Sequence, residues 1–202
     1  MTSAKQNGWL ENTIVLYTSD HGDMSMEHSQ FLKNSFYEPS SRVPLSIVPF
    51  NVPGMNPMGA KEIMNLTSHL DIVPTLIELA GGQPLPSSRG HSLVPFLLQQ
   101  TPLQSHPDYV AMEYHSNFAS TGSFALRQGE YKLITFGHTF PWFNATAYPP
   151  LLFNTELDPF ELRNLAAIDT ARVVNTLSDL FLRLLYYYYF FIALTLLFYY
   201  YY

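Results

Sequence analysis

The sequence predicts an α/β fold followed by a small α+β part with a short antiparallel sheet. Three observations predict it: an apolar, β-branched run over Thr13–Thr18, a helical pattern over Asp71–Gly81, and several short strand-like segments after residue 108. The first run is typical of a strand buried on both faces, as in a parallel sheet. The change from this strand and helix pattern to short strand-like segments divides the ordered chain near residue 105.

Composition excludes several classes of protein. The 202 residues are 47% hydrophobic and 13% charged, which suits a globular chain with one substantial core. The net charge of −6 and the lack of a Lys/Arg-rich run argue against a nucleic-acid partner. With no cysteine, the chain has no disulfide, no thiolate metal site and no cysteine nucleophile.

The first part is expected to contain two strands and a helix. The second strand, Val43–Phe50, has a proline near each end, and the connection before it carries the charged residues from Asp20 to Arg42. The helix has Asp71 as a cap-type residue, Pro74 in its first turn and Gly81 at its end. A short apolar element, Leu93–Leu98, follows.

The second part is expected to be an antiparallel sheet with one helix packed after it. The helix spans Thr170–Leu185, where apolar residues recur on one helical stripe. The strands are expected at Tyr109–Tyr114, Ser123–Leu126, Tyr131–Phe136 and Leu151–Asn154.

The two ends of the chain carry no targeting signal. The N-terminus lacks a signal peptide, so the protein is either cytosolic or begins inside something longer. In the low-complexity tail, 184–202, the apolar block Phe190–Phe198 is shorter than the roughly 20 residues of a membrane helix, so a membrane is not an expected partner. Asn65 and Asn144 lie in glycosylation acceptor patterns, which matter only in the secretory pathway.

Polar residues begin where the first strand ends, at Asp20-His21-Gly22. Ligands in open α/β sheets bind beyond the carboxyl ends of the strands. A carboxylate oxygen and an imidazole nitrogen could both serve a divalent cation there, although two ligands do not complete a site. Alternatively, Asp20 begins a turn in which Gly22 supplies a positive φ and His21 is a solvated loop residue.

Three blocks of sequence together resemble the sulfatase family. The first has Asp20-His21-Gly22, Glu27-His28, Lys33, Tyr37-Glu38 and Arg42-Val43-Pro44-Leu45 in the order of the family's "DHG…GEH…K…YE…RVPL" stretch. The second is "SHLDIVPTLIELAG", from Ser68 to Gly81. The third joins "ALRQGEYKLI" to "LLFNTELDPFELRNLA", and the resemblance spans residues 10–168.

The resemblance implies a partial sulfatase, alkaline-phosphatase-like fold, with a mixed sheet flanked by helices. Residues 1–104 would be the C-terminal part of the catalytic α/β domain and 105–183 the C-terminal α+β subdomain, before the tail. Within the family, 19–45 and 113–121 are most similar to the arylsulfatase K subfamily, which implies a sulfated glycosaminoglycan uronate or an aryl sulfate as substrate. A full-length protein of this kind would be lysosomal or secreted.

The resemblance also implies roles for three residues. Asp20 and His21 would bind a Ca²⁺ ion, or Mg²⁺ as in some relatives, and Lys33 would bind the sulfate group. Sulfatases of this kind attack with a formylglycine made from a C/S-x-P-x-R motif, which does not occur here. We therefore expect a sulfatase by family, present as its C-terminal portion, that is inactive alone.

Other residues and other functions have competing interpretations. Glu38 and Arg42 are spaced for a helical ion pair. His28 either lines a pocket or hydrogen-bonds a loop, and His115 is expected to be structural rather than substrate-facing. A non-catalytic protein that binds sulfated glycans or a partner is the main alternative. A two-metal phosphodiesterase is not favoured, because no recognisable metal set is formed by His69, Asp71, His91 and His106.

Overall fold

The computed structural model describes residues 2–11, 13–50, 52, 55, 62–83, 85–98, 106–115, 122–137, 149–173 and 175–176. The chain forms two compact units, Met1–Val110 and Ala111–Tyr202, here called the first and second units. The boundary falls inside the strand β5, Tyr109–Tyr114. The assignment of 1–104 to a catalytic domain and of 105–183 to a subdomain stays a prediction.

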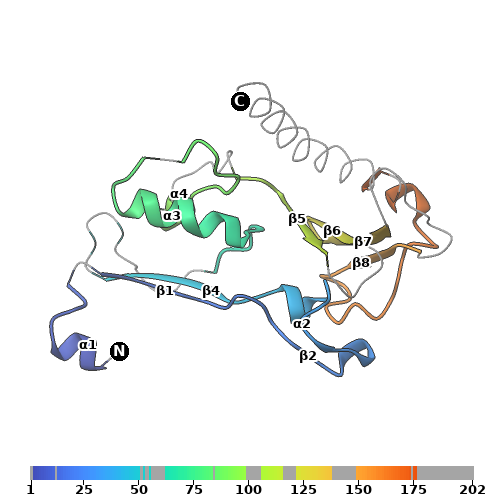
Figure 1. Ribbon diagram of the computed structural model, residues 1–202, viewed down its shortest axis with the longest axis horizontal. Coiled ribbons are helices and arrows are strands. Elements are labelled where there is room, and N and C mark those ends of the chain that lie inside the picture. The colour runs from blue at the N-terminus through green and yellow to red at the C-terminus, as the bar shows by residue number, and fades with distance from the viewer. Residues whose placement is uncertain are drawn as a thin grey trace, which may run out of the picture. The chain divides into compact units, whose positions relative to one another are not determined.

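The first unit begins with the helix α1, Thr2–Gln6, and contains a ribbon of two strands (Figure 1). These strands, β1 (Thr13–Thr18) and β4 (Leu45–Phe50), pair antiparallel with Thr18 opposite Leu45. The prediction that Thr13–Thr18 is buried on both faces, as in a parallel sheet, is wrong in the described residues, because β1 pairs antiparallel with β4 and none of its residues is fully buried. The prolines lie near the two ends of this strand, as predicted: Pro44 directly precedes β4, and Pro49 lies within it, opposite Ile14.

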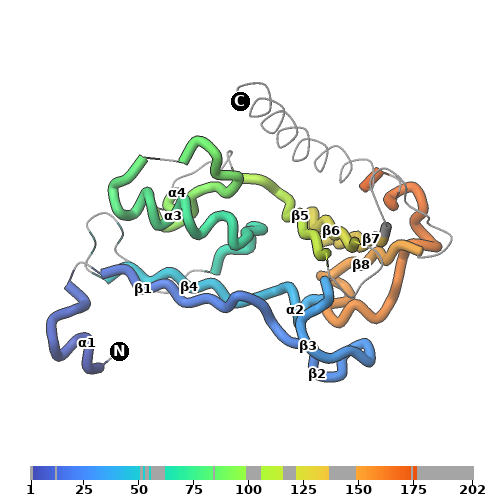
Figure 2. The backbone as a smooth tube through the Cα atoms, viewed as in Figure 1, coloured from blue at the N-terminus to red at the C-terminus, as the bar shows by residue number. Residues whose placement is uncertain are grey.

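The connection between the two strands folds into short elements that the tube in Figure 2 follows. They are β2 (Met24–Ser25), the 3₁₀ turn η1 (Glu27–Ser29), β3 (Phe31–Leu32) and α2 (Glu38–Ser41). β2 and β3 pair antiparallel as a hairpin. This connection carries most of the residues that the sequence singles out for function.

The helix predicted over 71–81 is confirmed as a 3₁₀ turn, η2 (His69–Asp71), that continues into α3 (Ile72–Leu79). It begins with a capping box, in which Ser68 and Asp71 satisfy each other's backbone N–H groups. It ends with Gly81 at φ +74° and with a hydrogen bond of 2.8 Å from the Gly82 N–H to the Ile77 carbonyl. The apolar element after it is confirmed as α4 (Val94–Leu97).

The four predicted strands of the second part form one sheet in the order β5-β6-β7-β8, in which β6, β7 and β8 pair antiparallel. After β5, the strands are β6 (Gly122–Gln128), β7 (Tyr131–Gly137) and β8 (Leu151–Asn154). Of the predicted helix 170–185, the described residues 170–173 and 175–176 are helical, and the rest lies outside the described residues. Asn144 and the tail also lie outside them, and no helix in the described residues is long and apolar enough to cross a membrane.

A buried ion pair lies in the second unit beside its apolar core. Lys132 on β7 places its Nζ 2.7 Å from Oε1 of Glu161, and both side chains are at most 1% exposed. Leu133, the next residue along the strand, packs with Leu152 and Val173. Removing one member of such a pair leaves the other charge buried without its counter-charge, which costs more than the pair itself contributes.

We predict that Glu161→Gln destabilises the second unit by about 3–5 kcal/mol, because the Lys132 ammonium stays buried without its carboxylate. Native-state hydrogen exchange of the β6 and β7 amides measures this loss as faster exchange. Glu156→Gln, at an exposed position nearby, is the control and should leave these rates unchanged. Equal exchange rates in the two variants would show that the ion pair does not stabilise the sheet.

Candidate functional site

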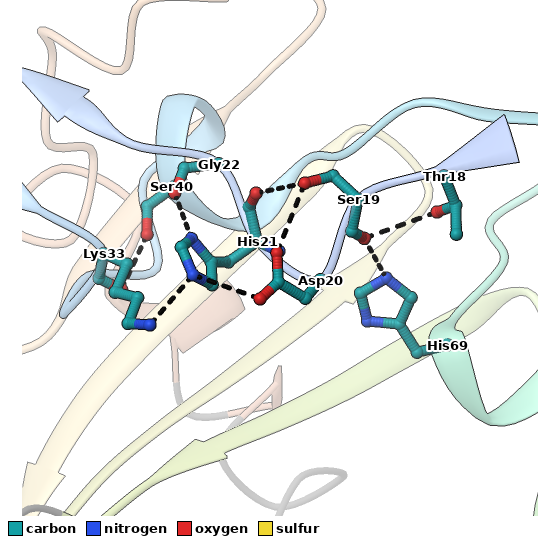
Figure 3. A network of polar contacts seen from close by, with 8 residues as sticks. All are labelled: Thr18, Ser19, Asp20, His21, Gly22, Lys33, Ser40 and His69. Carbon is teal, nitrogen blue, oxygen red and sulfur yellow. Dashed lines mark hydrogen bonds and ion pairs between the residues drawn. The ribbon is translucent and has the colours of Figure 1, made fainter.

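Asp20 and His21 follow β1 directly, and their side chains point toward each other (Figure 3). Asp20 Oδ2 lies 3.3 Å from His21 Nε2, and the two side chains are 83% and 37% exposed. Gly22 does not have the positive φ that the simple turn interpretation required. The end of β1 therefore holds a carboxylate and an imidazole side by side.

The hydrogen bonds of His21 fix which of its nitrogens accepts. Nδ1 lies 2.7 Å from the carbonyl oxygen of Gly22, which can only accept, so Nδ1 carries the proton. In the neutral ring, Nε2 then keeps its lone pair, on the side where Asp20 Oδ2 lies. Two acceptors at this separation favour a cation next to them.

In the isolated chain, the cation next to these two acceptors is the ammonium group of Lys33. Its Nζ lies 2.9 Å from His21 Nε2, so the ammonium donates to the lone pair of the neutral ring. The structure thus brings Lys33, which follows β3, to the residues that follow β1 (Figure 3). All three residues singled out from the sequence meet in one place.

The Asp20 carboxylate is held in its charged form. The backbone N–H of His21 donates to Asp20 Oδ1 over 3.0 Å, and this hydrogen bond lowers the pKa of Asp20 below its ordinary value. The Ser19 hydroxyl also lowers this pKa, while desolvation opposes the shift. An ionised carboxylate beside a neutral imidazole is a donor set suited to a divalent cation.

Ser40 on α2 holds the two halves of the site together, and no residue pattern indicated this role. Its side chain is buried and donates to the Lys33 carbonyl over 2.8 Å. Its own carbonyl accepts from the Gly22 N–H over 2.9 Å. One buried serine therefore fixes the backbone next to both His21 and Lys33.

Ser19 and His69 hold the other side of the loop. The Ser19 hydroxyl donates to the His21 carbonyl over 2.8 Å, and His69 Nε2 lies 2.8 Å from the Ser19 carbonyl. His69 comes from η2, next to the capping box of α3, so the helix is tied to the end of β1 (Figure 3). The role of His69 does not follow from a residue pattern, because it depends on a contact between segments that are distant in sequence.

The hairpin that leads to Lys33 has an unusual backbone. Positive φ values occur at Met26 (88°), His28 (51°), Ser29 (56°) and Leu32 (68°), none of which is glycine. The His28 ring stacks on Tyr37, with ring centres 3.7 Å apart and the planes 5° apart. His28 thus packs on another residue of the same connection.

The remaining candidates lie outside this site. Glu38 and Arg42 form the expected pair on α2, at 3.8 Å. His115 Nε2 lies 3.3 Å from Glu113 Oε2 at an exposed position. A second cluster, which the sequence did not predict, lies at the start of α3: Asp71 Oδ2 is 3.4 Å from buried His106 Nε2, and Asp71 Oδ1 accepts from the His91 N–H.

The donor set fits one side of a cation site and does not complete it. Ca²⁺ takes about six to eight oxygen ligands, and Asp20 and His21 supply two donors. Among the described residues, no group of three or more histidine, aspartate or glutamate side chains could hold a metal ion. This holds for the cluster around Asp71 as well.

Comparison with known proteins identifies the family of the chain. The family described as "N-sulphoglucosamine sulphohydrolase, C-terminal" matches residues 26–189. The chain belongs to the sulfatase family. It is 39% identical to arylsulfatase K of Danio rerio over 170 residues, covering 83% of this chain and 30% of the relative. The match to arylsulfatase K of Bos taurus is 37% identical and covers 81% and 29%.

Solved structures of this sulfatase fold match the same part of the chain. A 2-O GAG sulfatase superposes with a TM-score of 0.71 at 26% identity, covering 86% of this chain and 36% of that protein. The phosphonate monoester hydrolase of Agrobacterium radiobacter gives 0.73 at 28% identity, with 91% and 37% covered. The chain spans about a third of each relative and corresponds to the C-terminal region of the family.

We predict that Gly22→Ala disrupts the site, because the added Cβ would lie 1.9 Å from the carbonyl oxygen of Pro39. Such overpacking typically costs about 1–3 kcal/mol. It should also separate His21 from Lys33, since the Gly22 N–H is bonded to Ser40. The His21 ring shifts in an NMR spectrum measure the change, with the exposed Asp23→Ala as control. Unchanged ring shifts in the glycine variant would contradict the close packing.

Proposed function

We propose that the chain supplies part of the active site of a sulfuric ester hydrolase that acts on sulfated glycans or aryl sulfates. The observation that carries the proposal is the convergence of Asp20, His21 and Lys33 at one strand end in a member of the sulfatase family. A 2-O GAG sulfatase among the similar structures supports a glycosaminoglycan uronate as one substrate class. The chain's similarity to arylsulfatase K supports aryl sulfates as another.

Each residue has a role that its geometry permits. Lys33 would donate hydrogen bonds to the sulfate oxygens, which gain negative charge as the ester is cleaved. Asp20 and His21 would hold Ca²⁺, or Mg²⁺, with the Nε2 lone pair kept outward by the hydrogen bond from Nδ1 to the Gly22 carbonyl. A bound divalent cation would stabilise charge on the substrate's oxygen atoms.

The nucleophile has to come from outside the matched region. The sequence has no C/S-x-P-x-R motif from which formylglycine could be made. Losing one member of a catalytic group can remove several orders of magnitude in rate. The isolated chain should therefore show no sulfatase activity. The exposed acceptor Asn65 supports a lysosomal or secreted setting for a complete enzyme.

A chimaera tests the proposal directly. Residues 10–168 would replace the aligned region of Danio rerio arylsulfatase K, and hydrolysis of 4-methylumbelliferyl sulfate would be measured. We predict an active chimaera in which Lys33→Ala lowers kcat about a hundredfold or more, because the loss of a donor to developing charge has this size. Asp20→Asn should lower the activity and weaken its dependence on added Ca²⁺.

Arg163→Ala is the matched control, since it removes an exposed cation of the second unit that lies outside the site. It should leave kcat unchanged. A folded chimaera with equal kcat for the parent and the Lys33 variant would refute the role of this lysine. Hydrolysis of a phosphonate monoester, phenyl phenylphosphonate, in preference to the sulfate would favour a second function, phosphonate ester hydrolysis, which the phosphonate monoester hydrolase match supports.

Calcium binding to the isolated chain should be weak. Asp20 and His21 supply only two metal ligands in the described residues. The Lys33 ammonium already lies 2.9 Å from His21 Nε2, where the cation would bind. We predict no binding heat at micromolar Ca²⁺ in isothermal titration, with the Asp20→Asn variant as the reference. Tight binding that this substitution abolishes would mean that the chain holds a complete site.

A non-catalytic protein that binds sulfated glycans remains the second candidate, because a lysine and an imidazole can bind a sulfate without cleaving it. The chimaera separates the two functions. Binding of heparin-derived oligosaccharides without release of sulfate would favour this candidate.

A further inference from the structure

The ring of His69 uses one of its two nitrogens to hold the end of β1. Its Nε2 lies 2.8 Å from the carbonyl oxygen of Ser19, which can only accept, so Nε2 carries the proton. In the neutral ring, Nδ1 then keeps its lone pair. No hydrogen bond or ion pair within the described part of the chain reaches this nitrogen, and the side chain is exposed. His69 therefore presents one hydrogen-bond acceptor to solvent.

This acceptor lies beside the candidate site, as Figure 3 shows. The Lys33 ammonium lies 2.9 Å from the His21 ring, which lies 3.3 Å from Asp20. The Ser19 hydroxyl lies 3.4 Å from Asp20 Oδ1, and the Ser19 carbonyl is the group that His69 contacts. In Figure 3, Asp20 lies between Lys33 and His69, so the acceptor and the ammonium are on opposite sides of the carboxylate.

The backbone of His69 is held in place as well. His69 is the first residue of η2 and lies between the two members of the capping box. The buried Asp71 accepts from the Ser68 N–H over 2.8 Å, and the Ser68 hydroxyl accepts from the Leu70 N–H over 3.0 Å. Because the backbone and Nε2 are both held, Nδ1 has a defined direction, as a group that recognises a ligand requires.

A neutral acceptor beside a sulfate site suits a hydroxyl group. The sugar rings of sulfated glycans carry hydroxyls close to their sulfate esters, whereas the rings of 4-methylumbelliferyl sulfate carry none. A site that hydrogen-bonds a substrate hydroxyl discriminates against an analogue that lacks it. The acceptor on His69 therefore separates the two substrate classes that the proposed function includes.

We propose that His69 is a specificity-determining residue, whose Nδ1 accepts a hydrogen bond from a hydroxyl of the sugar that carries the sulfate. The inference rests on the proposed function, because it requires the sulfate to be held by Lys33 next to Asp20. It gives His69 no part in cleaving the ester. The contact favours a glycan over an aryl sulfate.

The tautomer is tested in the full chain. Nitrogen-15 NMR of the His69 ring at about pH 7.5, where an ordinary imidazole is neutral, should show the proton on Nε2 and the lone pair on Nδ1. The signals are assigned by their loss in His69→Ala. A neutral ring that carries its proton on Nδ1 would overturn the inference.

Binding to the chimaera tests the contact itself. A chimaera made without its formylglycine binds ligands without turnover, so dissociation constants can be measured for a disaccharide with a 2-O-sulfated uronate and for 4-methylumbelliferyl sulfate. We expect His69→Ala to weaken disaccharide binding about five- to tenfold, as for one hydrogen bond, and to leave binding of the aryl sulfate unchanged. His69→Gln should restore disaccharide binding, because its amide can donate to Ser19 and accept from the hydroxyl.

Arg163→Ala, outside the site, should change neither dissociation constant. Equal weakening of both ligands by His69→Ala would show that the imidazole only supports the loop, and this result would overturn the inference. Unchanged disaccharide binding in this variant, or a parent that does not bind the disaccharide, would overturn it as well. The proposed function fails in a different way: the chimaera with its formylglycine would release no sulfate, while the difference between the two ligands would persist and support the role of His69.

Discussion

The antiparallel pairing of β1 with β4 determines the rest of the first unit. Because Thr18 lies opposite Leu45, the residues between them form a closed loop whose two ends are neighbours. The hairpin and α2 fold inside this loop, and buried Ser40 bonds to the backbone on both sides of it. His21 and Lys33 meet for this reason. A register shift of one residue would move every side chain of the ribbon to the opposite face.

Local patterns predicted the elements well, while non-local geometry could not be predicted. The strand at Tyr109–Tyr114 and the helix ending at Gly81 follow from alternation, capping and a terminal glycine. The direction of β1 relative to β4 depends on the path of the connection, which no local pattern records. Gly22 is needed for the close approach of the Pro39 carbonyl rather than for a positive φ.

The site shows the same division. Asp20 and His21 stood out at the end of a predicted strand, and the resemblance to the sulfatase family assigned roles to them and to Lys33. Ser40 could not be found, because a serine among other serines gives no signal until its hydrogen bonds are known. Asp71 was expected to cap a helix, and its contacts with His91 and His106 join segments that are distant in sequence.

The hairpin before Lys33 shows how the site's shape is maintained. Each left-handed, non-glycine residue costs on the order of 1–2 kcal/mol, and four such residues occur close together. The hairpin would not adopt this left-handed backbone conformation by itself. Contacts such as the stacking of His28 on Tyr37 must therefore stabilise it. Glycines at these four positions would remove the backbone strain, but Lys33 would then no longer be held in one position. Backbone strain in the hairpin thus accompanies a fixed position of the Lys33 ammonium.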